Sequence, residues 1–123
     1  MVTPQSTISE KNMESEFKYH LTHKAEMDLE NIISYISVEL SNPQAASKFA
    51  DKLQTAIEEA RKFPESGLHA GNEFLQEYDI RKKLVGNYTM YYLPDFTEKM
   101  VYILRIVYSR RNMDEILRKL NID

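Results

Sequence analysis

The sequence predicts an α+β domain in which a helical hairpin packs on one face of a small, mainly antiparallel sheet. Two observations support this prediction. The first half holds two stretches with apolar residues at helical spacing, joined by a very short link, and the second half holds runs rich in β-branched and aromatic residues. The expected order of elements is β-α-α-β-β-β-α. A chain of 123 residues is long enough for one hydrophobic core.

The strand signals of the second half concentrate between residues 86 and 112. Two runs, 88–93 and 100–108, flank the turn-forming segment P-D-F-T-E-K, so we expect an antiparallel hairpin. Both faces of the second run are largely apolar, which predicts a central strand. Strict alternation along this run would place Tyr102, Leu104, Ile106 and Tyr108 on one face and Val101, Ile103, Arg105 and Val107 on the other.

Arginines stand out in and after this strand. Arg105 interrupts it, and a charge inside a central strand is costly unless its face meets water or a ligand. Arg110 and Arg111 follow at the end of the strand. Three guanidinium groups on or beside a rigid sheet predict a binding site. Replacing Arg105 and Arg110 by Ala should then abolish activity with little change in melting temperature, because arginines on a solvated face contribute little stability.

Two helices are predicted in the first half. After a short strand at 16–21, Thr22 can cap a helix whose apolar stripe runs to residue 40. Asn42 can cap the next helix, with Pro43 in its first turn. This second helix should end before Pro64, because the residue ahead of a proline resists helical geometry. We further expect a loop at 63–72, a strand within 74–85 and a short amphipathic helix at 113–120.

Charge is distributed unevenly along the chain. The net charge is −3, yet residues 13–77 carry 12 acidic and 6 basic side chains, whereas residues 78–123 carry 6 acidic and 9 basic ones. An acidic helical half and a basic sheet permit a local anionic target. The alternative explanation is solvated charge. Arg81, Lys82 and Lys83 can protect an edge strand from aggregation, and Arg110 and Arg111 can pair with the acidic helices.

Several site types are excluded or disfavoured by the composition. The absence of cysteine excludes disulfides, a thiolate nucleophile and cysteine-bound zinc. The histidines at 20, 23 and 69 lack metal-ligand spacing, so we expect neither a metal nor another cofactor. Without a bilayer-spanning run or an evident signal peptide, a cytoplasmic protein with no membrane partner is expected. Residues 1–15 should form a disordered tail and residues 16–123 a single domain.

Five short motifs follow one another along the chain. They are A-E-M-D-L-E-N-I-I-S-Y-I (25–36), P-Q-A-A-S-K-F (43–49), the Phe63-Pro64 break, I-R-K-K-L-V-G-N-Y-T-M-Y-Y (80–92) and I-L-R-I-V-Y-S-R-R-N (103–112). In this order they resemble the RelE/ParE superfamily of toxins from bacterial toxin–antitoxin pairs. The last motif is close to the ending common in the ParE-like branch, a strand followed by His-x-Arg-Arg. The resemblance covers residues 17–112.

For the RNA-cleaving RelE branch, the resemblance implies that basic residues of the strands grip the scissile phosphate and that a tyrosine of the last helix acts as base. Lys82 and Arg110 match two of the basic positions. Thr89 stands where an arginine is expected, and the tyrosine position falls near Ile116. Other ribonuclease branches carry a histidine where this chain has Tyr108. A tyrosine with an ordinary pKa of about 10 is a poor base near neutral pH.

The ribonuclease set is therefore incomplete, and the resemblance favours the ParE-like branch, which is reported to poison DNA gyrase. The expected target-binding residues are Arg81, Lys83, Arg105, Arg110 and Arg111. One alternative is a metal-independent ribonuclease that cleaves mRNA on the ribosome. In that case Lys82, Arg105 and Arg110 would stabilise the transition state, and Tyr108 would line the site. A second alternative is a non-toxic relic that only binds its antitoxin.

The resemblance also implies a protein partner. Antitoxins of this superfamily drape a tail across the toxin, so a cognate antitoxin and a toxin–antitoxin hetero-oligomer are expected. Apolar anchors of the tail should bind between the two helices, at Ile36, Phe49 and Leu53. An acidic segment of the tail should cover Arg105 and Arg110.

Overall fold

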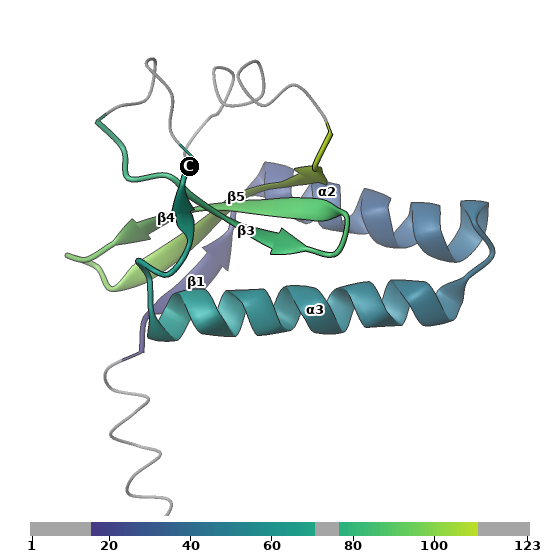
Figure 1. Ribbon diagram of the computed structural model, residues 1–123, viewed down its shortest axis with the longest axis horizontal. Coiled ribbons are helices and arrows are strands. Elements are labelled where there is room, and N and C mark those ends of the chain that lie inside the picture. The colour runs from purple at the N-terminus through teal and green to yellow at the C-terminus, as the bar shows by residue number, and fades with distance from the viewer. Residues whose placement is uncertain (1–15, 71–76, 111–123) are drawn as a thin grey trace, which may run out of the picture.

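The computed structural model describes residues 16–70 and 77–110, and it shows two helices lying side by side against one face of a sheet (Figure 1). The predicted α+β class is therefore confirmed. The predicted tail at 1–15, the predicted helix at 113–120 and Arg111 lie outside the described residues, as does the segment 71–76.

The sheet has five strands in the order β1-β5-β4-β3-β2. The strands are β1 (Lys18–Leu21), β2 (Leu68–His69), β3 (Arg81–Val85), β4 (Tyr88–Asp95) and β5 (Met100–Tyr108). The predicted hairpin is present as the antiparallel pair β4–β5, and β5 is central as expected. Its other neighbour, β1, runs parallel to it and gives the sheet its one parallel pair.

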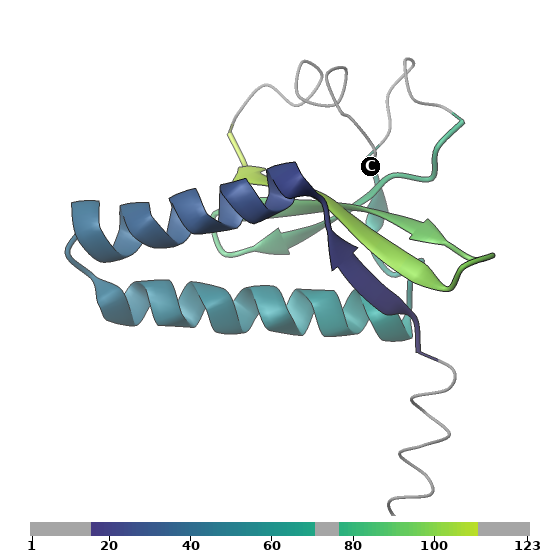
Figure 2. The same cartoon turned by 180° about the vertical axis from the view of Figure 1, so that it is seen from behind.

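The helical hairpin begins at α2 (His23–Ser34), continues into the π-helical turn η1 (Tyr35–Glu39) and returns as α3 (Pro43–Lys62). Figure 2 shows α2 and α3 antiparallel to each other from behind the sheet. Both predicted caps are present. The Thr22 side chain accepts a hydrogen bond from the Ala25 N–H at 3.1 Å, and Asn42 accepts one from the Ala45 N–H at 3.0 Å. The π-helical turn was not expected from the apolar stripe.

The short strand β2 lies in the segment that we predicted to be a loop. Its two residues pair with β3, Leu68 with Lys82 and His69 with Arg81. Both residues are exposed, so the sequence shows no alternation of buried and exposed positions here. The loop prediction at 63–72 is thus wrong at these two positions, because two residues are too few to show a strand period.

The core has two parts, one on each face of the sheet. The part under the helices includes Val101, Ile103 and Ile106 of β5, and the part on the other face includes Leu104 and Val107. The predicted strict alternation therefore holds through Leu104 and is wrong beyond it. A β-bulge causes the difference: Tyr91 pairs with Arg105 and Tyr92 with Ile103, so Leu104 is an extra residue and the later side chains change faces.

Candidate functional site

Arg105 is engaged by a residue of helix α2. Its Nε donates to Asp28 Oδ2 at 2.7 Å and its Nη2 donates to Asp28 Oδ1 at 3.1 Å. Both side chains are mostly buried, with 16% and 15% of their surface exposed. This bidentate geometry is the strong form of an arginine–carboxylate pair. The charge that the sequence left unexplained on a central strand is therefore balanced inside the protein.

The same carboxylate also completes the edge of β5. Strand β1 stops at Leu21, opposite Ile103, and the residues that follow it take over. Thr22 donates from its N–H to the Ile103 carbonyl and from its Oγ1 to the Leu104 carbonyl, both at 3.0 Å. Asp28 Oδ2 then accepts a hydrogen bond from the Ile106 N–H at 2.9 Å. The start of α2 thereby satisfies backbone groups of β5 that lie beyond the end of β1.

Arg81 has a comparable internal role at the other side of the sheet. Only 8% of the residue is exposed. Its Nη1 donates to the carbonyls of Glu65 and Gly67 at 2.8 and 2.9 Å, and its Nε donates to Asp79 Oδ2 at 3.1 Å. The guanidinium therefore holds the segment that leads into β2. Of the predicted target-binding residues that the structure describes, Arg81 has the least exposed side chain.

The Tyr92 side chain also holds the segment that leads into β2. Its hydroxyl accepts a hydrogen bond from the Gly67 N–H and donates to the Pro64 carbonyl, both at 2.9 Å. A Cβ at Gly67 would lie 2.6 Å from this hydroxyl, so only glycine fits there. Burial raises the pKa of the Tyr92 phenol above its ordinary value, although the hydrogen bond from the Gly67 backbone acts against this shift.

Lys82 and Lys83 line a groove between the outer edge of β3 and helix α3. The groove has a volume of about 460 Å³, and its other lining residues are Glu59, Ser66, Gly67, Leu68 and Leu84. Lys83 forms an ion pair with Glu59, with Nζ and Oε1 3.3 Å apart. Within the described residues, Lys82 has no such partner. The groove therefore combines a cation with exposed leucine side chains.

Tyr108 and Arg110 lie at the far end of β5. The Tyr108 ring packs edge-on against Tyr88, with centroids 5.8 Å apart, and Arg110 is exposed just beyond it. Lys82 shares a row of the sheet with Tyr91 and Arg105, whereas Tyr108 is three residues further along β5, about 10 Å away. The structure thus does not gather the ribonuclease set predicted from the resemblance around one point.

Thr89 occupies the position where the resemblance placed an arginine, and it is 4% exposed. Its hydroxyl lies 2.8 Å from the Ser109 hydroxyl, within hydrogen-bond distance.

Burial raises the pKa of Tyr91 above its ordinary value of 10.0, and burial together with Tyr35 and Tyr108 does the same for Tyr88. A phenol with a raised pKa is a weaker candidate for a general base at neutral pH.

The predicted antitoxin anchors are part of the core. Ile36, Phe49 and Leu53 are 9%, 6% and 4% exposed and pack between the helical hairpin and the sheet. Their side chains are therefore not presented to a partner. Sequence periodicity correctly placed them on the apolar stripe, but it did not distinguish the stripe that faces the sheet from one that faces a protein partner.

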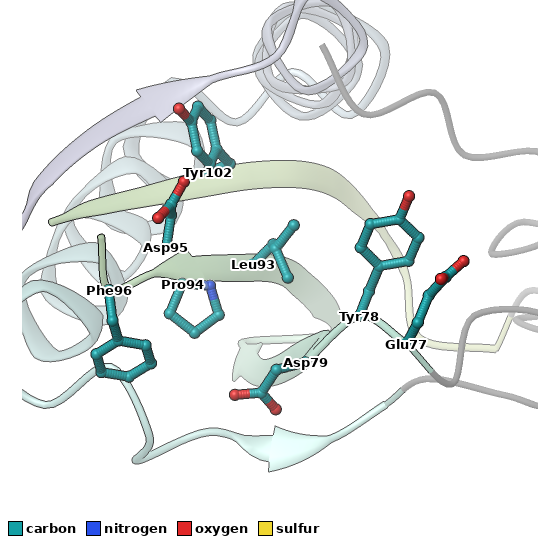
Figure 3. Close-up of a pocket in the computed structure, with 8 residues that line it drawn as sticks. All are labelled: Glu77, Tyr78, Asp79, Leu93, Pro94, Asp95, Phe96 and Tyr102. Carbon is teal, nitrogen blue, oxygen red and sulfur yellow. The ribbon is translucent and has the colours of Figure 1, made fainter. Parts of the chain in front are cut away.

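A pocket of about 530 Å³ opens beside Leu93 and Pro94 of β4, where Figure 3 shows the side chains around it. Its other lining residues are Glu77, Tyr78, Asp79, Asp95, Phe96 and Tyr102. Three carboxylates make this pocket unsuited to a phosphate. Two of them have internal partners, because Asp95 accepts hydrogen bonds from the N–H groups of its own turn and Asp79 pairs with Arg81.

The described residues offer neither a metal site nor a membrane-spanning helix. Among residues 16–70 and 77–110, no three His, Asp or Glu side chains are grouped so that they could hold a metal ion. The helices in this part of the chain are too short or too polar to cross a membrane.

Comparisons with other proteins agree with the fold. A family model described as "ParE toxin of type II toxin-antitoxin system, parDE" matches residues 19–113. Among solved structures, the chain is similar to one from the chromosomal ParDE system of P. aeruginosa, with a TM-score of 0.59 and 20% identity over 76% of this chain and 97% of that chain. No curated protein sequence matches the chain.

A second solved structure with the same fold is the RelBE2 toxin–antitoxin complex from Mycobacterium tuberculosis. The TM-score is 0.54 and the identity 19%, over 76% of this chain and 98% of that chain. Identities this low establish the fold alone, whereas the family model spans nearly the whole described domain, from β1 to the end of β5. The chain therefore belongs to the family of ParE toxins of type II toxin–antitoxin systems.

Proposed function

We propose that this toxin arrests growth by binding DNA gyrase and that it does not cleave RNA. The observation that supports this most strongly is the engagement of Arg105 by Asp28. Phosphoryl transfer depends on cations that are free to stabilise the developing negative charge. A guanidinium whose donors already hold a carboxylate would have to exchange a bidentate partner for the substrate phosphate.

The tyrosines weaken the ribonuclease reading further. RNA cleavage without a metal needs a general base near the attacking hydroxyl. The raised pKa values of Tyr88 and Tyr91 oppose such a role, and Tyr108 lies about 10 Å along β5 from the row that holds Lys82 and Arg105. Binding a protein target makes no demand on proton transfer, and the exposed Arg110 remains suitable for it.

The deciding experiment compares two assays on the same purified toxin. We expect inhibition of gyrase supercoiling, weakened by Arg110→Ala, and intact mRNA in a ribosome-dependent cleavage assay. Lys24→Ala is the matched control, because Lys24 is an exposed cation at the start of α2, outside the basic sheet. Cleaved mRNA with unimpaired gyrase would reverse the assignment. A toxin that is inactive in both assays would favour the second alternative, a non-toxic relic that only binds its antitoxin.

We also propose a protein antitoxin that binds the outer edge of β3. The two similar structures belong to toxin–antitoxin assemblies. Strand β2 pairs only with Arg81 and Lys82, so within the described residues the rest of β3 has no partner on that side. An open edge with flanking apolar side chains favours the addition of an extended peptide.

The chemistry of the groove defines the segment that would fit it. Leu68 and Leu84 are 71% and 75% exposed, and Lys82 lies between them on the paired strands. An extended antitoxin segment with alternating apolar and acidic residues would place its apolar side chains on the leucines and a carboxylate near Lys82. In this proposal the apolar anchors of the antitoxin bind the exposed leucines of the groove and not the buried apolar stripe of the helices.

A further inference from the structure

A second basic pocket lies where the β3–β4 turn approaches helix α3, an arrangement visible in Figure 1. Its volume is about 210 Å³, and its lining residues are Ile36, Ala45, Lys48, Phe49, Lys52, Gly86, Asn87 and Tyr88. We call it the turn pocket. No carboxylate is among these lining residues, in contrast to the pocket beside β4.

Two lysines give the turn pocket its charge. Lys48 and Lys52 are four residues apart on α3, so their side chains lie one above the other on the same helix face. Like charges at this spacing are unfavourable for the helix itself. Over residues 16–70 and 77–110, neither ammonium group has a carboxylate within ion-pair distance. Their charge is therefore available to an anion from outside.

The turn itself brings these cations close to the backbone. Gly86 has a φ of 61°, and the Lys52 ammonium lies 4.0 Å from where a Cβ on Gly86 would be. The carbonyl of Asn87 accepts a hydrogen bond from the Ser109 N–H at 3.0 Å. The exposed Arg110 follows Ser109 directly in the sequence.

Two aromatic rings, Phe49 and Tyr88, line the turn pocket, and Tyr35 and Tyr108 lie near Tyr88 outside its lining. Tyr88 packs between Phe49 and Tyr108, with ring centroids 5.2 and 5.8 Å away. Tyr35 and Tyr108 are 50% and 44% exposed, so each offers part of its side chain to solvent. The π-helical turn η1 begins at Tyr35, and such turns are rare and frequently found at functional sites. The raised pKa of Tyr88, caused by burial, Tyr35 and Tyr108, keeps its hydroxyl protonated and able to donate.

We propose that the turn pocket binds single-stranded nucleic acid, with a backbone phosphate between Lys48 and Lys52 and bases stacked on Tyr35 and Tyr108. Ammonium groups and neutral hydroxyl donors suit a phosphate, which only accepts hydrogen bonds. Exposed aromatic rings beside a basic pocket are the usual platform for unpaired bases. A duplex keeps its bases stacked on one another, so it cannot use these rings.

The proposal is tested by fluorescence anisotropy of a labelled oligothymidine or oligouridine with the purified full chain. Lys48→Gln/Lys52→Gln should weaken binding about tenfold or more at low salt. It should also lower the slope of log Kd against log salt by about 0.7, because the two lysines share one phosphate and each phosphate contact in a single strand contributes about 0.7. Tyr35→Ala should weaken binding about 5- to 100-fold and leave this slope unchanged, because stacking releases no counterion.

The matched control is Lys24→Gln/Lys62→Gln, which removes the same charge from exposed positions outside the turn pocket. Equal losses in both double variants would overturn the proposal, because binding would then be general surface attraction. Absence of binding at low salt would overturn it as well, and duplex binding as tight as single-strand binding would overturn the stacking. No gyrase is present in this assay, so its result is independent of the proposed target.

Discussion

At the scale of single residues, the most informative feature is Asp28. One carboxylate accepts three hydrogen bonds, two from the Arg105 guanidinium and one from the Ile106 backbone. The protein thereby joins a helix to the central strand of its sheet through a partly buried ion pair. Such pairs contribute little when compared with a good apolar contact, but removing one partner leaves a charge without compensation.

Asp28→Ala should therefore lower the free energy of unfolding by about 3 kcal/mol, because it leaves a mostly buried guanidinium and the Ile106 N–H without acceptors. Urea unfolding measures this directly. Glu30→Ala, at an exposed position of the same helix, is the control and should change stability by less than about 0.5 kcal/mol. If Asp28→Ala changed the free energy of unfolding as little as the control does, the Asp28–Arg105 pair would contribute nothing to stability.

The same pair changes an expectation drawn from the sequence. Arg105→Ala was expected to leave the melting temperature nearly unchanged, as for an arginine on a solvated face. With Asp28 bound to it, the substitution should instead destabilise the fold, because the carboxylate loses its partner. A loss of toxicity in this variant alone cannot assign Arg105 to the target site. Arg110→Ala is the more direct test, since Arg110 is exposed and forms no ion pair within the described residues.

Buried tyrosines predict a loss of stability at alkaline pH. The pKa values of Tyr88, Tyr91 and Tyr92 are raised in the folded state from 10.0. A group with a raised folded pKa contributes stability below its unfolded pKa and loses that contribution as pH rises through the folded value. Stability should thus fall above about pH 10.

Tyr91→Phe tests this cause, because its pKa shift comes from burial alone. The variant should keep the stability of the parent chain at neutral pH and lose less of it above pH 10. The measurement is urea unfolding of both chains at matched pH values. Only the difference between the two chains is diagnostic, because every other group is common to both. Identical pH profiles would exclude Tyr91 as a contributor.

Residue types were predictable from the sequence, but their partners were not. Thr22, Asn42 and Pro43 act where the sequence placed them, because caps depend on neighbours within four residues. The partner of Arg105 is 77 residues away. Asp28 had a sufficient local explanation as an acidic residue early in a helix, so nothing in the pattern pointed to Arg105.

At the scale of elements, the long helices and strands were predicted well and the irregular ones were not. The β4–β5 hairpin and both α-helices follow from periodicity over many residues. The two-residue strand β2, the π-helical turn and the β-bulge each involve one or two residues that break the period. These breaks lie at the residues discussed above, since the bulge is next to Arg105 and β2 leaves most of the β3 edge open.

The open edge of β3 leads to a prediction about the antitoxin. Leu84→Glu should weaken antitoxin binding about tenfold or more, because it places a carboxylate on the apolar part of the groove. Its effect on stability should stay small, since Leu84 is 75% exposed. Met27→Glu is the control, an exposed apolar residue on α2 outside the groove. Calorimetric titration with the antitoxin measures both, and equal affinities would place the antitoxin elsewhere.

At the scale of the whole molecule, charge separates into an acidic first half and a basic second half, as the sequence indicated. Ion pairs within the protein balance several charges of the basic half, because Arg81, Lys83 and Arg105 all have acidic partners. Within the described residues of this half, Lys82, Lys99 and Arg110 remain as exposed or half-buried cations without an ion pair. The net charge of the second half therefore overstates the field that a partner meets.

This remaining field should act mainly on the rate of antitoxin binding. The association rate should fall steeply between low and high salt, because screening shortens the range of attraction to an acidic segment. Dissociation should change little, since it depends on the apolar contacts. Stopped-flow binding at several salt concentrations measures both rates. An association rate independent of salt would rule out electrostatic steering by Lys82 and Arg110.

The position of β5 in the sheet has a consequence for synthesis on the ribosome. Strand β1 is made first but pairs only with β5, the last strand of the described domain. Until β5 emerges, β1 and β4 have no strand between them, and Asp28 has no Arg105 to bind. Contacts this distant in sequence form late. The nascent toxin therefore lacks both its complete sheet and the Asp28–Arg105 pair until β5 has been synthesised.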